Sequence, residues 1–224
     1  MKKDFKIFDN YLSEDDFKEI QKWLSFQKTS DCQNCLTGQR WNVDLLKDLN
    51  SDIIIKKPQI SSNEYLKKSA NDDGFNAFDN YKNKINDLIF SLPENKKARI
   101  SVLESSFYRY QYKSGILLHR DSSHNGNFVR RYGITLYLND EWYPNWGGEL
   151  TIYRGNDDTY RTEDLNYSDL EPIKTIIPKR NRLVIVDGLW HRVSPNLNKN
   201  IDRIALQTFV TINYKPKPVP KVHK

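Results

Sequence analysis

Three side chains of the metal-binding type stand out in the second half of the chain: His119, Asp121 and His191. His119 and Asp121 are two residues apart, and residues i and i+2 of an extended strand point to the same face, so the pair could hold one ion from one side. With His191, the set would offer two imidazoles and one carboxylate to one face of an octahedral ion. That ligand set is typical of non-heme Fe(II) sites that activate oxygen. Taken alone, the same residues could be a turn cap and two ordinary histidines, so their surroundings must decide.

A run of strands surrounds these residues. Apolar and polar residues alternate from residue 100 to residue 112, with many aromatic side chains, which is a strand pattern. Similar runs follow, separated by turns rich in Gly, Asn, Asp and Pro. The predicted strands are 100–112, 116–119, 132–138, 149–153, 173–177, 182–186 and 204–212. Strands at this short spacing, after two helices, indicate a mostly β fold of the sandwich or jelly-roll kind with supporting α-helices.

The two helices are predicted before residue 98. Ser13 suits the N-cap of the first helix, because acidic residues follow it and complement the positive helix end. Apolar residues then recur at helical spacing, at Phe17, Ile20, Trp23 and Leu24. A second helix is predicted from Phe75 to Leu92. The polar stretch Gln27–Asp73 between the helices has no clear pattern, and whether it forms a lid stays open.

The composition limits the class of protein. No apolar run in the 224 residues approaches the ~20 needed to cross a bilayer, and the N-terminus lacks an apolar signal region, so we expect no membrane partner and a cytoplasmic location. The formal net charge of +6 is spread over many lysines, which permits a nucleic-acid partner without indicating one. Cys32 and Cys35 form a C-x-x-C pair with no second pair to complete a zinc cage, so we expect two reduced thiols.

A series of short motifs runs from Tyr112 to about Val210. The motifs are His119-Arg120-Asp121, Ile134–Asn139, Trp142, Trp146–Leu150, Ile152-Tyr153, Pro178, Asn181–Ile185, His191–Val193 and Arg203. In this order they resemble the Fe(II)/2-oxoglutarate dioxygenase superfamily, in its prolyl 4-hydroxylase-like branch. They cover a little under half of the chain, and their combination is specific although no single motif is.

The resemblance implies a double-stranded β-helix, a jelly-roll (cupin-like) fold with the metal in its mouth. We therefore expect one domain over residues 1–224, with N-terminal helical support over 1–98 and the β-helix core over 99–214. Residues 215–224 would form a flexible tail rich in Pro and Lys.

The resemblance also implies roles for single residues. His119, Asp121 and His191 would hold Fe(II). Relatives that halogenate carry a small residue in place of the carboxylate, so Asp121 favours hydroxylation. Arg203 would pair with the distal carboxylate of 2-oxoglutarate, because a planar guanidinium forks onto a carboxylate through two bonds. Strand alternation places Ala205 and Gln207 on the face of Arg203, and Ile204, Leu206 and Thr208 on the other.

Several further residues are candidates for the cosubstrate or substrate. Tyr137 and Thr135 share one strand face, and the family often places a tyrosine hydroxyl there on the same 2-oxoglutarate carboxylate. Core packing is the alternative for Tyr137, and Tyr110 and Tyr112 are similar candidates from the preceding strand. Three tryptophans could line a substrate groove or simply pack, namely Trp142, Trp146 and Trp190. We expect the pair Gly147-Gly148 to serve a tight turn or a close backbone approach.

The chemistry implied is oxidative decarboxylation of 2-oxoglutarate by dioxygen at Fe(II), coupled to hydroxylation of an unactivated C–H bond, with ascorbate as a candidate stimulant. A prolyl residue in a protein or peptide is the first choice of substrate, by family analogy. A free amino acid, a glycan or another small metabolite is the alternative. Nucleic-acid dealkylation is disfavoured, because that branch carries a second arginine six residues after the first, where this chain has Phe209.

Two other classes stay open at this stage. A jelly-roll binding module without turnover would not need all four of His119, Asp121, His191 and Arg203. A zinc hydrolase using the same three metal ligands would not need Arg203. The sequence does not indicate the oligomeric state.

Overall fold

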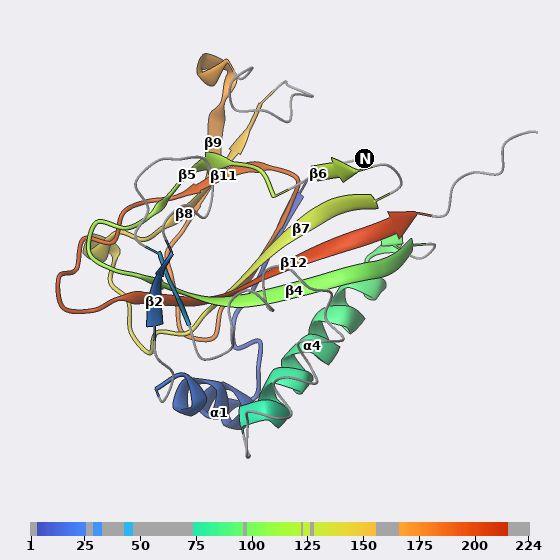
Figure 1. The fold of residues 1–224 in the computed structure, drawn as a ribbon. Helices are drawn as coiled ribbons and strands as arrows, with labels where there is room; N and C mark the ends of the chain where they lie inside the picture. Colours follow the sequence, from blue (N-terminus) through green and yellow to red (C-terminus); the bar gives the residue numbers. More distant parts are fainter. Residues whose placement is uncertain are drawn as a thin grey trace, which may run out of the picture.

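The computed structural model describes residues 4–25, 29–32, 43–46, 74–95, 98–121, 123–125, 128–155 and 166–214. Within these residues the chain forms two antiparallel sheets and two α-helices. The helices lie against one side of the larger sheet, and the smaller sheet lies on its other side (Figure 1). This arrangement is a double-stranded β-helix with helical support, the fold class that the sequence predicts.

The larger sheet has the strand order β1-β10-β7-β12-β4-β3-β2, with the short β6 paired to β7. Its strands are β1 (Asp4–Phe8), β2 (Thr29–Cys32), β3 (Val43–Leu46), β4 (Ala98–Tyr110), β6 (Ser123–Asn125), β7 (Phe128–Tyr137), β10 (Leu183–Asp187) and β12 (Arg203–Tyr214). β12 pairs with β4 along nearly its whole length and with β7 on its other side. Arg203 and Tyr110 are the first pair of that ladder, so both lie at one end of the sheet.

The smaller sheet has the order β5-β11-β8-β9. Its strands are β5 (Ile116–His119), β8 (Leu150–Arg154), β9 (Glu171–Ile176) and β11 (Trp190–Val193). β5 and β11 are antiparallel neighbours, and their register sets His119 opposite His191. Three short 3-10 turns complete the described elements: η2 (Pro93–Asn95), η3 (Pro144–Trp146) and η4 (Tyr167–Asp169).

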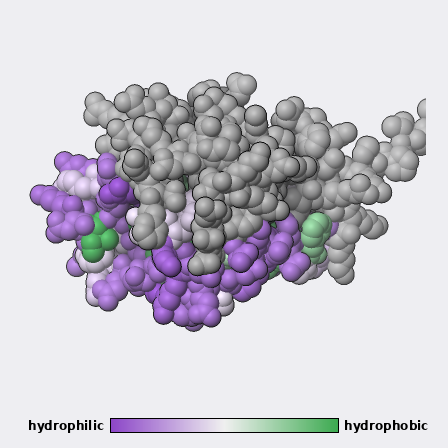
Figure 2. Space-filling view, turned by 60° about the horizontal axis from the view of Figure 1, so that its bottom comes forward, coloured by the Kyte–Doolittle hydropathy of each residue, from purple (hydrophilic) through white to green (hydrophobic). Residues whose placement is uncertain are grey.

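The two helices are α1 (Glu14–Ser25) and α4 (Gly74–Ser91). Ser13 caps α1 as predicted, because its Oγ accepts the backbone N–H of Asp16 at 3.1 Å while the hydroxyl donates to the Asp16 carboxylate at 2.7 Å. Both helices bury one apolar stripe against the larger sheet. The described surface on that side of the molecule is mostly hydrophilic (Figure 2), as expected for amphipathic helices.

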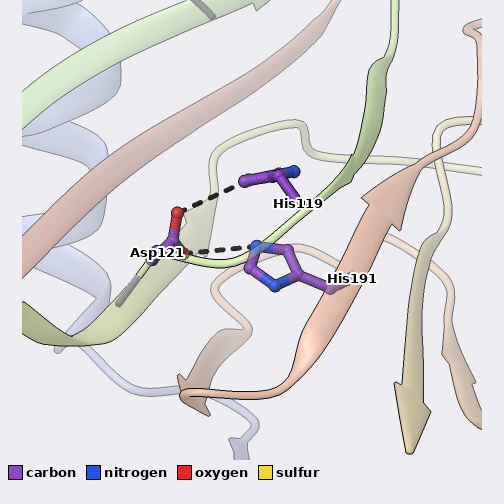
Figure 3. Close-up of side chains that lie close together, drawn as sticks. All are labelled: His119, Asp121 and His191. Atoms are coloured by element: carbon purple, nitrogen blue, oxygen red, sulfur yellow. Dashed lines mark ion pairs between the residues drawn. The ribbon is translucent and has the colours of Figure 1, made fainter. Parts of the chain in front are cut away.

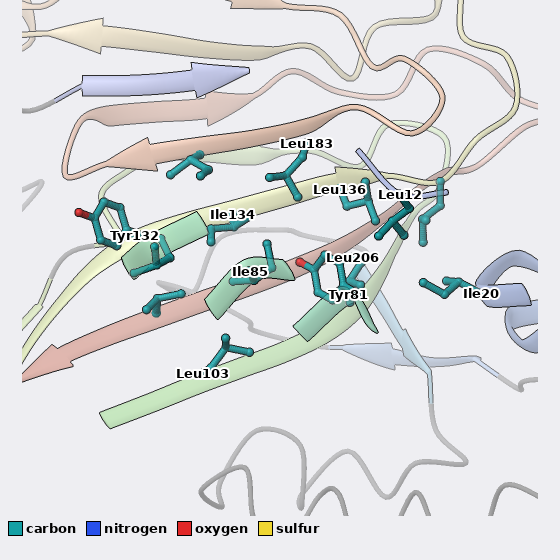
Figure 4. Close-up of a cluster of buried hydrophobic side chains, with 14 of the residues drawn as sticks. Leu12, Ile20, Tyr81, Ile85, Leu103, Tyr132, Ile134, Leu136, Leu183 and Leu206 are labelled. Atoms are coloured by element: carbon teal, nitrogen blue, oxygen red, sulfur yellow. The ribbon is translucent and has the colours of Figure 1, made fainter. Parts of the chain in front are cut away.

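Two apolar clusters lie on opposite sides of the larger sheet. One joins the helices to the sheet and includes Ile20, Tyr81, Ile85, Ile134 and Leu206 (Figure 4). Each fully buried Ile or Leu stabilises the fold by roughly 1.5–3 kcal/mol relative to exposure. The other cluster fills the space between the two sheets, with residues such as Tyr137, Ile152, Val184 and Val193. Strand alternation thus leaves one face of β7 and β12 for the helices and the other for the barrel interior.

The predicted strands are all present, with ends shifted by a few residues. β11, which carries His191, is absent from the prediction. The region before residue 98 contributes more than helices, since β1 pairs with β10 and β3 pairs with β4. Most of Gln27–Asp73, Cys35 and the tail 215–224 lie outside the described residues, while Cys32 ends β2. In the described part of the chain, no helix is long and apolar enough to span a membrane.

Candidate metal centre

His119, Asp121 and His191 lie close together, with ligand-type atoms all within 4.8 Å of one another. The two imidazole rings lie side by side, with centroids 4.2 Å apart, because β5 and β11 set the histidines in register. Asp121 follows the end of β5 by two residues and turns its carboxylate toward both rings (Figure 3). The predicted spacing therefore does bring the three side chains together.

Hydrogen bonds to the backbone fix the orientation of both imidazoles. Nδ1 of His119 lies 2.7 Å from the carbonyl oxygen of Leu117, and Nδ1 of His191 lies 3.0 Å from that of Leu189. A carbonyl oxygen only accepts, so each Nδ1 must carry the proton and donate it. Each Nε2 is then the nitrogen that points into the site, which is how ligating histidines are held in metalloproteins.

Asp121 sits between the two Nε2 atoms. Its Oδ1 is 3.4 Å from Nε2 of His119 and its Oδ2 is 3.2 Å from Nε2 of His191. Burial opposes a charge on this carboxylate, but the pull of the two imidazoles is stronger and holds the pKa of Asp121 well below its usual range. Burial also lowers the pKa of His191, and the charge of Asp121 outweighs it, so that pKa is raised. One anionic oxygen ligand and two imidazole nitrogens fit Fe(II) by donor type and number.

Arg203, the first residue of β12, is a buried cation. It is 1% exposed, and its guanidinium carbon lies 4.5 Å from the ring centre of Tyr110 and 5.0 Å from that of Tyr137. Its Nε and Nη1 have no hydrogen-bond partner among the described residues. A desolvated cation is costly unless an anion pairs with it. The guanidinium is therefore a buried charge for which the described residues show no anionic partner.

A turn of two glycines makes room for that guanidinium. Gly147 and Gly148 have φ angles of +70° and +71°, which favour glycine. A Cβ on Gly148 would lie 2.8 Å from Cδ of Arg203 and 3.1 Å from Cζ2 of Trp142. The predicted close approach is present at both glycines, because Gly148 lies against the side chain of Arg203 and Gly147 lies against the carbonyl oxygen of Pro195.

The tyrosines and the threonine divide between two places. Tyr110 and Tyr137 are buried against Arg203, and burial raises the pKa of both hydroxyls although the guanidinium opposes it. Thr135 is buried on the same face of β7 and donates to Oε1 of Gln207 at 3.3 Å. Tyr112 is not brought to this set, because β4 ends at Tyr110 and the ring of Tyr112 lies exposed beside lysine side chains.

β7 connects the two ends of the site. On one face it carries Gly133 beside Asp121, then Thr135, then Tyr137 beside Arg203. With about 3.3 Å of rise per residue, Gly133 and Tyr137 are roughly 13 Å apart along the strand. The carboxylate–imidazole cluster and the unpaired guanidinium thus lie toward opposite ends of one face.

The candidate tryptophans serve packing in the structure. The indole N–H of Trp142 donates to the carbonyl of Gly147 at 2.8 Å, and the ring of Trp146 packs edge-on against it. Trp190 is 1% exposed, with the guanidinium carbon of Arg120 4.6 Å from its ring centre. Sequence reasoning overlooked Gly133, whose position inside a strand is the kind of signal that marks a close approach.

Comparison with known proteins agrees with this geometry. Residues 105–211 match the family model of the 2OG-Fe(II) oxygenase superfamily. That segment runs from β4 through β12 and contains the three metal-type residues and Arg203. Among curated protein sequences, none matches the chain.

Solved structures show the same fold at low sequence identity. A prolyl hydroxylase from Trichoplax adhaerens, in complex with a hypoxia-inducible factor peptide fragment, has a TM-score of 0.59 at 16% identity, over 92% of this chain and 82% of that one. A prolyl-4-hydroxylase from Pseudomonas putida has a TM-score of 0.55 at 16% identity, over 94% and 92%. HygX from Streptomyces hygroscopicus, with nickel and 2-oxoglutarate bound, has a TM-score of 0.55 at 12% identity, over 95% and 83%. Residues 105–211 therefore form a domain of the 2OG-Fe(II) oxygenase superfamily, which identifies an Fe(II)- and 2-oxoglutarate-dependent dioxygenase, and the chain has the fold of prolyl 4-hydroxylases.

Proposed function

We propose that the chain hydroxylates a prolyl residue in a protein or peptide, with Fe(II) held by His119, Asp121 and His191. The observation that carries the site assignment is the joint geometry of two charged groups. A buried carboxylate faces two Nε2 atoms at one end of β7, and a buried guanidinium without an ion-pair partner in the described residues lies at the other. A dianionic cosubstrate that chelates a metal at one end and carries a carboxylate at the other suits this arrangement.

In this assignment each residue has a defined task. His119 and His191 present Nε2 lone pairs because their Nδ1 protons are held by backbone carbonyls. Asp121 supplies the negative charge that the metal requires. Arg203 binds the distal carboxylate of 2-oxoglutarate, with Tyr110, Tyr137 and Thr135 around it. A bound Fe(II) would supply the oxidising chemistry, in which one atom of dioxygen enters 2-oxoglutarate as it becomes succinate and carbon dioxide, and the other enters the substrate C–H bond as a hydroxyl group.

The choice of a prolyl substrate is supported by the solved structures with which the chain shares its fold, since two of them are prolyl hydroxylases. The test is to incubate the chain with Fe(II), 2-oxoglutarate and a panel of proline-containing peptides. We expect one peptide to gain a single oxygen atom on proline by mass spectrometry, in step with succinate release. Succinate release without any modified peptide would reject the prolyl substrate and leave the oxygenase assignment intact.

A small-molecule substrate is the second candidate, and one observation favours it. HygX, which shares the fold with a TM-score of 0.54 over 95% of this chain, has been solved with hygromycin B bound. If the peptide panel is inert, we expect an amino acid, glycan or other small metabolite to accelerate succinate release. The assay of succinate release therefore tests peptide substrates and small-molecule substrates alike.

Substitution of two adjacent glycines, Gly147 and Gly148, tests whether Arg203 binds 2-oxoglutarate. Gly148→Ala would push its methyl into Cδ of Arg203, so we expect the KM for 2-oxoglutarate to rise by roughly 10-fold or more. Gly147→Ala has nearly the same positive φ, but its Cβ would meet the carbonyl oxygen of Pro195 instead. Both variants should lose stability from backbone strain. Only Gly148→Ala should change the KM beyond about 2-fold, and an equal change in both would contradict a specific role for Arg203.

A further inference from the structure

Gly133 lies in the interior of β7, directly behind the carboxylate of Asp121. A Cβ built on Gly133 would lie 1.7 Å from Oδ2 of Asp121, 2.8 Å from its Cγ and 3.3 Å from its Cβ. No other residue is among the three nearest atoms to that position. The carboxylate therefore occupies the space that any other residue type would fill with its own side chain.

The backbone at this position gives no reason for a glycine. Gly133 is paired on both sides, to Val186 of β10 and to Phe209 of β12, and its φ angle is not among the positive ones. Any residue could adopt this extended conformation, and glycine in a strand interior weakens a sheet. What the missing side chain provides is space, and the atom that uses the space is a carboxylate oxygen.

The position of that oxygen matters to the whole cluster. Oδ2 is the atom 3.2 Å from Nε2 of His191, while Oδ1 is 3.4 Å from Nε2 of His119. A methyl group at position 133 would have to be at ordinary contact distance, about 3.5 Å, from Oδ2. The Oδ2 atom of Asp121 would then have to move by well over an ångström from its present place, which changes its distance to the imidazole of His191. Bonds from metals to carboxylate oxygens are about 2.0–2.2 Å long and tolerate little displacement.

We propose that Gly133 is a positioning residue for the metal centre, which seats the carboxylate of Asp121 at the depth where it and the two imidazoles can share one ion. This inference rests on the proposed role of Asp121 as a metal ligand. The glycine touches neither metal nor substrate; it acts through the position of Asp121. Any side chain larger than hydrogen at this position displaces the ligand that carries the negative charge.

The test is a double-substitution cycle on the full chain without metal, with Co(II) added anaerobically and its visible absorption recorded. We expect Gly133→Ala to weaken Co(II) binding by roughly 10- to 100-fold, the range seen when the support of a ligand is lost. In the Asp121→Ala background the same substitution should change affinity by less than about 2-fold, because the methyl then enters vacated space. The two remaining histidines keep weak binding measurable at high Co(II).

Thermal unfolding of the same four proteins separates positioning from simple folding defects. If Gly133→Ala alone folds poorly, the double variant should regain the stability of Asp121→Ala, since the clash partner is gone. Unchanged Co(II) binding in Gly133→Ala, equal losses in both backgrounds, or a double variant that still fails to fold would each overturn the positioning role. If Asp121→Ala itself binds Co(II) like the parent chain, the metal-ligand assignment of Asp121 fails instead.

Discussion

Asp121→Asn is expected to lower Fe(II) affinity by roughly 100-fold or more and to reduce succinate release in proportion. The amide keeps the size of the side chain, so the space beside Gly133 stays filled and the fold is not disturbed. It removes the only carboxylate of the cluster, which lies 3.2 Å from one imidazole nitrogen and 3.4 Å from the other. A neutral amide oxygen is a weaker ligand for a divalent ion than a carboxylate. Anaerobic Fe(II) titration and a succinate assay measure the two effects.

The control for this substitution removes the same charge elsewhere. Glu171→Gln takes a carboxylate from the exposed start of β9, so it changes net charge by the same amount without touching the cluster. We expect it to leave Fe(II) affinity within about 2-fold of the parent. Asp121→Asn with parental Fe(II) affinity would reject the assignment of the three ligands. Turnover supported by Zn(II) as well as by Fe(II) would instead favour hydrolytic chemistry.

Two of the three members of the cluster were predictable from a local signal. His119 and Asp121 are two residues apart on one short segment, and that spacing alone sets them on one face. His191 is far away in sequence, and its place became predictable only through the order of the motifs around it. What the sequence could not provide is the register of β5 with β11, which brings the two imidazole centroids to 4.2 Å. Register depends on packing between strands distant in the chain.

The tyrosines show where strand alternation fails to predict which side chains reach Arg203. Tyr110 and Tyr112 are two residues apart, so a continuous strand would place both on the face of Arg203. The chain instead leaves β4 after Tyr110, and Lys113 has a φ of 68° in a turn closed by the backbone bond from Ser114 to Gln111. Only Tyr110 therefore reaches Arg203. A strand end shifted by two residues is enough to exchange a buried side chain for an exposed one.

Gly133 was overlooked for a related reason. Alternation predicts the face that a residue of β7 occupies, but it does not predict what approaches that face from another strand. The approach of Asp121 to within 1.7 Å of a Cβ position on Gly133 arises from the path of the chain after β5. Sequence reasoning is thus most reliable for side chains that act within one element, and least reliable for the space between elements.

Arg203 raises an energetic question that the fold alone does not answer. Its guanidinium is 1% exposed, and its Nε and Nη1 lack hydrogen-bond partners within the described residues. Burying a charge costs several kcal/mol, and desolvated contacts with the rings of Tyr110 and Tyr137, at about 2 kcal/mol or more each, offset part of that cost. A chain selected for stability alone would hold an apolar side chain here. The arginine is explained if binding of an anion offsets the cost, as expected at functional sites.

Arg203→Met is therefore expected to separate stability from function. Without 2-oxoglutarate the variant should be at least as stable as the parent in urea unfolding, because an apolar side chain of similar length replaces an unpaired buried charge. Its affinity for 2-oxoglutarate should fall by roughly 100-fold, since the guanidinium fork for the distal carboxylate is gone. Anaerobic titration of the Fe(II) form with 2-oxoglutarate, followed by its weak visible charge-transfer band, measures that affinity.

Measurements of Fe(II) affinity and of stabilisation by 2-oxoglutarate test the same prediction. Fe(II) affinity should stay within about 2-fold of the parent, because Arg203 and the metal cluster lie toward opposite ends of β7. The parent should gain about 2.7 kcal/mol of stability at a 2-oxoglutarate concentration 100 times its Kd, and the variant only about 0.4 kcal/mol at the same concentration, which then equals its own Kd. Arg203→Lys, which keeps the charge and loses the fork, should fall between the two. A destabilised Arg203→Met that still develops the full band at parental 2-oxoglutarate concentrations would mean that the arginine is structural, and that the distal carboxylate is bound elsewhere.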